Sequence, residues 1–147
     1  MSAYLLDTNI LLRMCDGNAS THLLAGEATA QLLRQEHQVY LTSQNLIEFW
    51  VVATRPHEVN GLGWDLEKTN HEVVQILAQF PLLEDNSKIF EYWLNIVTTN
   101  QLKGKRVHDA RLVAVMLAHG ITHLLTFNPK DFKDIAGIIV MHPQTVI

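Results

Sequence analysis

The chain alternates short apolar runs with longer amphipathic segments. The short runs are typical of buried strands, which we expect at residues 3–6, 39–41, 81–83, 122–126 and 138–141. The longer segments repeat apolar residues every three or four positions, which predicts helices at about residues 20–36, 43–54, 65–80, 86–100 and 108–119. This alternation favours a three-layer α/β/α fold around a central, mostly parallel sheet.

Polar residues and glycine mark several helix ends. Thr42 or Ser43 can cap one helix, and Asn86 can cap another, because their side chains accept hydrogen bonds from free backbone amides. Pro56 ends the helix that precedes it. Gly120 follows the last expected helix, at a position that commonly adopts a left-handed conformation.

Composition is that of a globular protein. The 147 residues are 48% hydrophobic and 18% charged, which fits one folded domain over residues 1–147. Cys15 is the single cysteine, so no internal disulfide can form and a cysteine-based zinc site is not expected. There is no basic, apolar leader at the start and no apolar stretch near the ~18 residues of a membrane span. We therefore expect a cytoplasmic protein.

The formal net charge is −4, with eight histidines counted as neutral. Binding to nucleic acid relies on Lys and Arg contacts to phosphate, so this charge lowers the expectation of such binding without excluding it. An enzyme that gathers carboxylates around a cation and keeps its basic residues at one rim would have the same balance.

Three acidic residues lie in apolar segments. Asp7 follows the first strand and precedes Ile10, Leu11 and Leu12, where it either caps the next turn or helix or belongs to a site. Thr8 and Asn9 have the same two interpretations, as turn residues or as groups that orient Asp7.

Glu48 lies within an expected helix, on the same face as Val51 and Val52. Burial of a lone carboxylate is costly, so Glu48 should be neutralised, paired or bound to metal. The alternative is that it points to solvent or pairs with Arg13 or Arg55.

Asp109 starts a helix and shares a face with Leu112, Val113 and Met116. An Asp in a first helical turn is also favoured by the free amides and the helix dipole, with no further function. If the three acids converge, their mutual repulsion requires protons or a cation. Oxygen ligands without cysteine indicate Mg²⁺ or Mn²⁺.

Four motifs in order make the chain resemble the PIN-domain family. They are LDTNIL at 6–11, NLIE at 45–48, HDARLVA at 108–114 and TFNPKDF at 126–132. The stretch GKRVHDA at 104–110 further resembles the VapC-like toxin branch of bacteria. The resemblance covers nearly the whole chain.

The resemblance implies a ribonuclease that hydrolyses RNA phosphodiester bonds with a metal-activated water. It implies that Asp7, Glu48 and Asp109 bind Mg²⁺ or Mn²⁺ at one end of the sheet. The family's fourth, often acidic, position falls on Asn128, which can reach a metal only through water, so the number of metal ions stays open. Such a protein would be the toxin of a toxin–antitoxin pair, with a cognate antitoxin as partner, and would form a homodimer.

Further residues receive expected roles from their places in these motifs. Thr8, Asn9, Thr126 and Asp131 are expected to support the acidic centre. Lys103, Lys105, Arg106 and Arg111 lead into Asp109 and are expected to contact RNA phosphates, unless they form only a solvated loop.

Three other functions would also place an acidic residue after the first strand. A dehalogenase-like phosphatase would need a second Asp where Asn9 stands, and a receiver domain would not explain Glu48. The main alternative is a PIN-like module that binds RNA or protein without catalysis. The presence of all three acids favours an enzyme.

Overall fold

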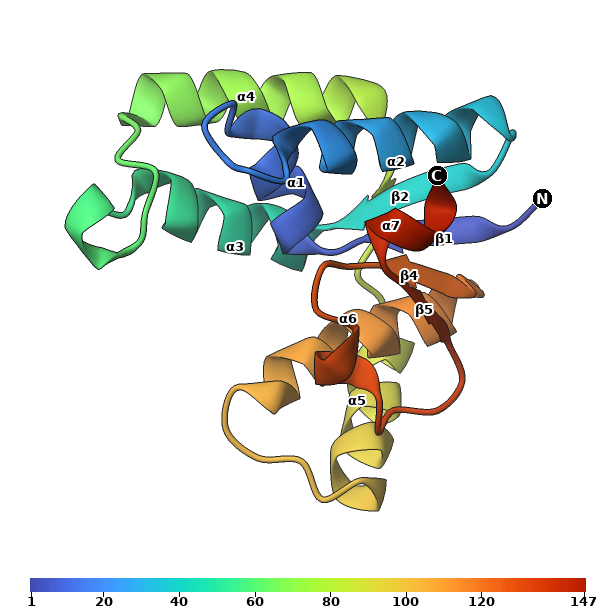
Figure 1. Cartoon of the computed structure of the whole chain (residues 1–147). Helices are drawn as coiled ribbons and strands as arrows, with labels where there is room; N and C mark the ends of the chain where they lie inside the picture. The colour runs from blue at the N-terminus through green and yellow to red at the C-terminus, as the bar shows by residue number, and fades with distance from the viewer.

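A five-stranded parallel sheet lies at the centre of the molecule, with helices on both faces (Figure 1). The computed structural model describes all of residues 1–147. The strand order is β3-β2-β1-β4-β5, and every neighbouring pair is parallel. The strands are β1 (Ala3–Leu6), β2 (Gln38–Thr42), β3 (Leu82–Leu83), β4 (His123–Leu125) and β5 (Ile139–Met141). The three-layer α/β/α fold predicted from the sequence is confirmed.

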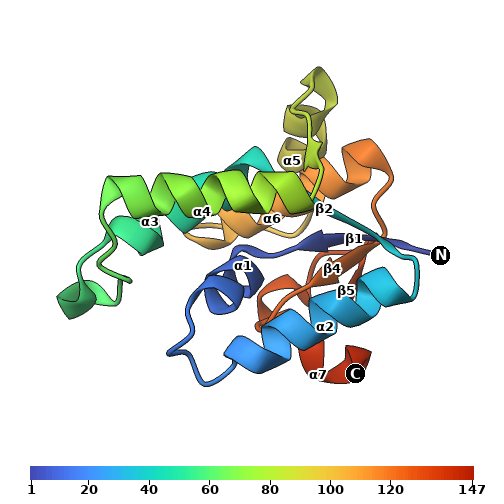
Figure 2. The same cartoon turned by 90° about the horizontal axis from the view of Figure 1, so that it is seen from above.

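The helices divide between the two faces of the sheet. The helices are α1 (Thr8–Cys15), α2 (His22–Arg34), α3 (Ser43–Thr54), α4 (Leu66–Gln79), α5 (Ser87–Thr99), α6 (Arg106–His119) and α7 (Pro143–Val146), with 3-10 turns η1 (His57–Val59) and η2 (Pro129–Phe132). In Figure 1, α1, α2, α3, α4 and α7 lie on one side, and α5 and α6 lie together on the other. Figure 2 looks down from above, with α4 drawn in front of α3 and α6. None of these helices combines the length and apolarity needed to cross a membrane.

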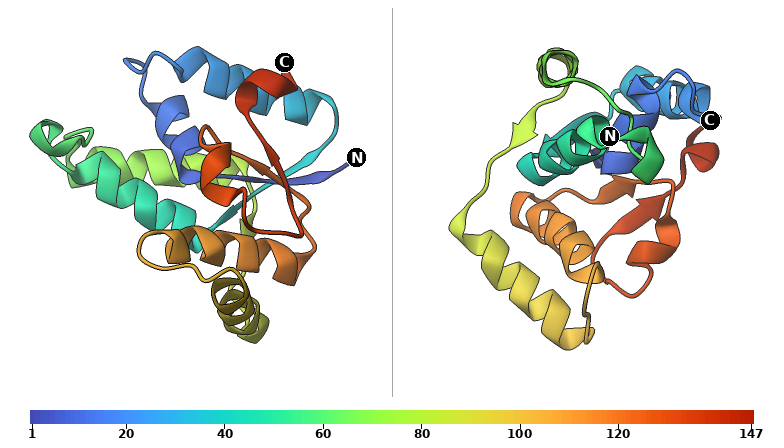
Figure 3. Two further views of the ribbon diagram at one scale, coloured as in Figure 1. Left: turned by 60° about the horizontal axis from the view of Figure 1, so that its bottom comes forward. Right: turned by 90° about the vertical axis from the view of Figure 1, so that its left-hand side faces the viewer.

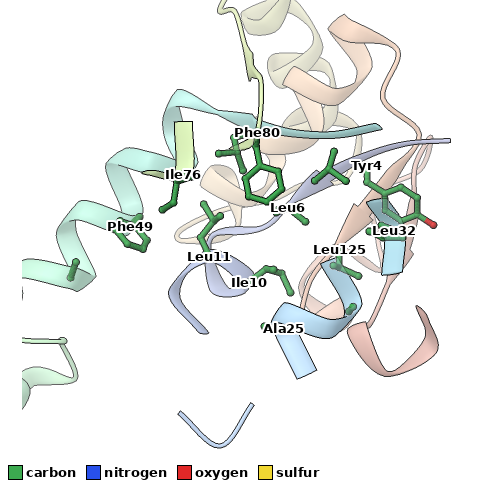
Figure 4. Close-up of a cluster of buried hydrophobic side chains, with 14 residues drawn as sticks. Tyr4, Leu6, Ile10, Leu11, Ala25, Leu32, Phe49, Ile76, Phe80 and Leu125 are labelled. Atoms are coloured by element: carbon green, nitrogen blue, oxygen red, sulfur yellow. The ribbon is translucent and has the colours of Figure 1, made fainter. Parts of the chain in front are cut away.

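Each face of the sheet has its own apolar core, because side chains alternate along a strand. Leu6 and Leu125 belong to the core beneath α1, α2 and α3, drawn in Figure 4. Leu5 and Leu124, their neighbours in the chain, belong to the core beneath α5 and α6. All four are fully buried, which explains why these strands read as continuous apolar runs.

Most helices begin and end where the sequence pattern predicts. Thr42 and Asn45 form a reciprocal capping box at the start of α3, and Asn86 caps α5. Gly120 adopts φ +70° after α6. The helix expected at 20–36 is shorter, and α6 begins at Arg106 rather than at residue 108. Two helices, α1 and α7, were not predicted, because each is too short to display a helical repeat.

The parallel topology sets the position of the site. All five strands run in one direction, so the carboxyl ends of β1, β2 and β4 lie at the same edge of the sheet. The segments that follow these three strands start with Asp7, Ser43 and Thr126. Two of the conspicuous motifs in the sequence therefore meet at this edge.

Candidate active site

Asp7 lies between the central strand and the first helix. Its Oδ1 accepts a hydrogen bond from the backbone N of Thr8 at 2.8 Å, so the side chain caps α1. Its Oδ2 accepts one from the hydroxyl of Thr126 at 2.8 Å. The register of β1 with β4 pairs Leu6 with Leu125, which places the next residues, Asp7 and Thr126, side by side. Asp7 thus has both of the roles that the sequence left open, as a cap and as a member of a polar cluster.

Asn9 contacts both Asp7 and the end of β4. Its amide nitrogen lies 3.2 Å from Thr126 Oγ1 and 3.5 Å from Asp7 Oδ2. Its side-chain oxygen Oδ1 accepts a hydrogen bond from the backbone N of Phe127 at 3.2 Å. Asn9 therefore joins the start of α1 to the end of β4 and restricts the orientation of Asp7.

Glu48 points toward Asp7's helix and not into solvent. Its Oε1 accepts a hydrogen bond from the hydroxyl of Thr8 at 2.8 Å, and its Oε2 accepts one from the amide of Gln44 at 3.1 Å. The amide of Asn45 donates in turn to the Thr8 hydroxyl at 3.2 Å. Glu48 forms no ion pair, so the alternative pairing with an arginine is wrong.

Asp109 lies half-buried in the first turn of α6, and its carboxylate accepts no hydrogen bond from the protein. The apolar residues Leu112, Val113 and Met116 of its helix are buried, as the sequence pattern indicated. Gln44 donates a second hydrogen bond, at 2.8 Å, to the carbonyl oxygen of His108. Gln44 thereby fastens the start of α6, with Asp109, to the helix that bears Glu48.

The carboxylates lie within one another's electric field. Burial raises the pKa of Asp7 to about 6, the negative charges of Glu48 and Asp131 act in the same direction, and hydrogen bonds from Thr126 and Thr8 oppose them. Burial also raises the pKa of Asp109 to about 6, reinforced by the charges of Asp7, Asp131 and Glu48 and opposed by that of Lys105. Like charges gathered in this way favour either protonation or a bound cation.

Asp131 supplies the fourth negative charge of the cluster. It lies exposed in η2 and acts on both Asp7 and Asp109. Asn128 is also exposed, and its side chain forms no hydrogen bond, although its backbone N donates to Thr126 Oγ1 at 3.0 Å. Asn128 is the fourth position of the sequence interpretation and carries no charge, whereas the charge of Asp131 raises the pKa of both Asp7 and Asp109. The expected water-mediated role of Asn128 stays a prediction.

The donor set fits a hydrated divalent cation. No group of three or more acidic, histidine or cysteine side chains is arranged to enclose a metal by itself. Mg²⁺ does not need such an enclosure, because it keeps several waters and is commonly held by one or two carboxylates together with substrate phosphate. The free carboxylate of Asp109 and the oxygens of Asp7 and Glu48 are hard ligands of the required kind.

The four basic residues that precede and follow Asp109 have different partners. Arg106 pairs with Asp134 at 3.3 Å, and Arg111 pairs with Asp85 at 3.3 Å. Lys103 and Lys105 are exposed and form no ion pair. The two lysines are therefore the more available cations of the set.

Gln44 and Asn45 are the polar groups of the site that the sequence interpretation missed. Gln44 precedes Glu48 by four residues, so the two share a helix face, and this spacing was visible in the sequence. Asn45 was visible as the third residue after a Thr cap. Both are buried, which neither pattern alone reveals.

Comparison with known proteins places the chain in a family. The PIN-domain model matches residues 4–138, and no curated protein sequence matches. Similar solved structures include VapBC2 from Rickettsia felis bound to a promoter DNA fragment, with 19% identity, a TM-score of 0.71 and coverage of 95% of this chain and 98% of that one.

Two further structures share the fold. A toxin–antitoxin complex from Klebsiella pneumoniae has 24% identity and a TM-score of 0.67 over 95% of this chain and 97% of that one. Mycobacterium tuberculosis VapC20, a sarcin–ricin loop cleaving toxin, has 15% identity and a TM-score of 0.58 over 82% and 86%. With a family model that spans nearly the entire chain and a fold shared along its length, the protein belongs to the PIN-domain family.

Proposed function

We propose that this protein is a Mg²⁺- or Mn²⁺-dependent ribonuclease that hydrolyses RNA phosphodiester bonds and acts as the toxin of a toxin–antitoxin pair. The observation that carries the proposal is geometric: Thr8 joins Asp7 to Glu48 at one edge of the sheet, and Gln44 fastens Glu48 to the first turn of α6, which bears Asp109. Membership in the PIN family and a fold shared with toxin–antitoxin proteins support it. We assign residues 1–147 to a single nuclease domain.

Repulsion between the carboxylates of the site favours binding of a cation. Two carboxylates about 4 Å apart repel each other by about 4 kcal/mol at an effective dielectric constant of 20. Asp7, Glu48 and Asp109 would hold the cation, with Asn128 in reach through a water. A bound divalent cation lowers the pKa of a water molecule and offsets the charge that develops on the phosphate oxygens.

The remaining polar residues keep these acids in place. Thr8 and Gln44 each donate to one oxygen of Glu48, so its carboxylate is held in one orientation. Thr126 and Asn9 do the same for Asp7. Supporting contacts of this kind commonly affect activity or metal affinity by about 10- to 100-fold.

RNA would approach from the side of the loop that leads into α6. Lys103 and Lys105 are exposed there, and Lys105 already acts electrostatically on Asp109. A phosphate held by these lysines would lie near the acidic centre despite the net charge of −4, because phosphate contacts act locally. Arg106 and Arg111 would contribute less than the lysines, because each must first leave its surface ion pair with an aspartate.

Cleavage of single-stranded RNA by the purified protein tests the proposal. We expect cleavage with Mg²⁺ or Mn²⁺, none with EDTA, and none from Asp7→Asn. The matched control is Asp16→Asn, which makes the same change at the opposite end of α1 and should cleave normally. Cleavage that persists in EDTA or in Asp7→Asn would contradict the proposal.

The alternative is a non-catalytic PIN-like module that holds RNA or a protein partner. The presence of all the acids and their supporting hydrogen bonds favours the enzyme, since simple binding of an anion gains nothing from a cluster of negative charge. RNA that is bound but never cleaved, with any divalent cation, would establish the module.

A further inference from the structure

A surface pocket of about 380 Å³ lies between α5 and the first turns of α6. Figure 3 shows these two helices side by side, away from the α3–α4 side of the molecule. Four planar side chains contribute to its walls: Phe90, Trp93, His108 and Arg111. This volume falls within the range of small-ligand sites, which starts at about 300 Å³.

The pocket offers a rigid aromatic surface. The rings of Phe90 and Trp93 have centroids 5.5 Å apart and are tilted by 32°. The indole N–H of Trp93 donates to the carbonyl oxygen of Val107 at 2.8 Å, which fixes that ring against the start of α6. Phe90 nevertheless keeps 63% of its surface exposed. An aromatic ring left open to water beside a fixed one provides a stacking platform.

Polar groups of the pocket suit the edge of a base and its phosphate. No acidic residue lines the pocket, although the chain as a whole is acidic. The side-chain oxygen Oδ1 of Asn86 caps α5 by accepting a hydrogen bond from Lys88 N at 2.9 Å, and the side-chain nitrogen Nδ2 of Asn86 has no partner. The ring of His108 also forms no hydrogen bond. These groups are donors and acceptors placed around an apolar floor, as recognition of a nucleobase requires.

The pocket and the acidic centre share a wall. His108 lines the pocket and immediately precedes Asp109. Its carbonyl oxygen is held by Gln44, which also holds Glu48. Arg111, one turn further along α6 than His108, donates a hydrogen bond to Gln44 Oε1 at 3.4 Å. A ligand in the pocket would therefore lie next to the phosphate that the acids act on.

We propose that this pocket binds one unstacked nucleobase of single-stranded RNA, adjacent to the phosphodiester bond that is cleaved. The proposal rests on the nuclease function proposed above and adds a determinant of sequence preference to it. The base stacks on Phe90, and Asn86 and His108 meet its hydrogen-bonding edge. Arg111, which is held by Asp85 and Gln44, bounds the pocket on the α6 side.

The test measures RNA binding in the Asp7→Asn background, where cleavage is prevented. A dye-labelled, single-stranded oligoribonucleotide is compared with a series in which one nucleotide at a time is abasic. At one position, loss of the base should weaken binding about tenfold, the size expected for one base–aromatic stack. Phe90→Ala should weaken binding of the intact RNA by the same factor and abolish the effect of that abasic position. Phe90→Ala combined with the RNA that is abasic at that position should weaken binding no more than either change alone.

Tyr92→Ala is the matched control, because Tyr92 is a partly exposed aromatic residue of α5 that does not line the pocket. Tyr92→Ala should bind each RNA of the series with the same affinity as the Asp7→Asn protein. Equal affinity of Phe90→Ala and its parent, or an unchanged abasic profile, would overturn the subsite.

The outcomes separate the subsite from the function. If the wild type cleaves RNA and Phe90→Ala leaves RNA affinity unchanged, the subsite proposal is wrong and the nuclease function stands. Absence of both cleavage and RNA binding removes the function and the subsite with it. If Phe90→Ala instead converts a dimer to a monomer in light scattering without a change in RNA affinity, a second copy of the chain covers the pocket, and the proposal is wrong.

Discussion

The amide nitrogen of Gln44 lies 3.1 Å from Glu48 Oε2 and donates a hydrogen bond to it. The same nitrogen donates to the carbonyl of His108 at 2.8 Å. One buried side chain thus connects the glutamate on α3 to the first turn of α6, where Asp109 lies. The distance between Glu48 on α3 and Asp109 on α6 therefore depends on this contact.

Gln44→Leu should reduce RNA cleavage by about tenfold and raise the Mg²⁺ concentration needed for half-maximal activity, because Glu48 loses one of its two donors. The measurement is the cleavage rate over a Mg²⁺ titration. Gln31→Leu makes the same chemical change on α2, where the side chain bonds only Arg34, and should leave the titration unchanged. An unaltered Mg²⁺ dependence in Gln44→Leu would assign the residue to packing alone.

Asp7→Asn and Asp109→Asn should abolish cleavage and stabilise the metal-free protein. Each removes one charge from a cluster in which burial and like charges raise the pKa of both acids to about 6. We expect a gain of about 2 kcal/mol at neutral pH, given about 1.4 kcal/mol per pKa unit and partial exposure to solvent. This corresponds to a rise in Tm of roughly 4–8 °C. A lower Tm would mean that capping of α1 or α6 outweighs the repulsion.

The metal-free protein should become less stable as pH rises from about 4 to about 6. Asp7 and Asp109 have folded-state pKa values near 6, above the ordinary 3.8, so the folded state holds more protons than the unfolded state in this interval. Their ionisation above it therefore opposes folding. Melting curves in EDTA across this range measure the effect, and Asp7→Asn should flatten the profile.

Stabilisation by Mg²⁺ should follow the opposite course. The cation binds ionised carboxylates and competes with protons for them, so its effect on Tm should grow as pH rises through about 6. The comparison is the Tm with and without Mg²⁺ at each pH. A Mg²⁺ effect that does not change with pH would separate the cation site from Asp7 and Asp109.

Lys105→Ala should weaken RNA binding and lower its salt dependence by roughly 0.7 to 1 in slope, since one phosphate contact is lost. Lys105 is exposed and forms no ion pair. Arg106→Ala should instead have the smaller effect on RNA affinity, because Arg106 is paired with Asp134 at 3.3 Å. RNA titrations over a salt series in the Asp7→Asn background distinguish the two. Equal slopes for Lys105→Ala and its parent would place the RNA path elsewhere.

The protein should form a homodimer or bind a partner through the apolar surface of α3 and α4. Ile47 and Val51 of α3 are exposed by 64% and 55%, and they line an entirely apolar pocket with Leu46, Trp50 and Val73. Exposed apolar patches of this kind mark interaction surfaces. Val51→Glu should therefore shift light scattering from twice the mass of one chain to that of a monomer. A monomeric wild type at tens of micromolar would contradict the dimer.

The sheet and most helices could be predicted because their patterns are local. The apolar runs of β1, β4 and β5 and the repeats of α2 to α6 are readable within a window of a few residues. The helix α1 could not be predicted in this way, because its eight residues are too few to show a helical repeat. Its first residues, Thr8 and Asn9, are also common in turns. Its formation depends on the cap that Asp7 provides.

The site was predictable in its members and not in its geometry. Asp7, Glu48 and Asp109 stood out as acids in apolar segments, but a sequence window cannot show that residues 7 and 126 are adjacent. Nor could it show that Arg106 and Arg111 are paired with Asp134 and Asp85, which are distant in sequence. Such partners follow from the strand order, and the strand order is set by long-range packing.

The pairing of the central strand also determines when this protein can become active as it is synthesised. β1 leaves the ribosome before its neighbour β4, which brings Thr126 to Asp7 and follows more than a hundred residues later. A nascent chain that has produced α1, α3 and α6 therefore still lacks the contact that orients Asp7. The proposed nuclease activity would arise only after β4 has been synthesised and has paired with β1, so a ribosome carrying a chain that stops short of β4 would not be exposed to it.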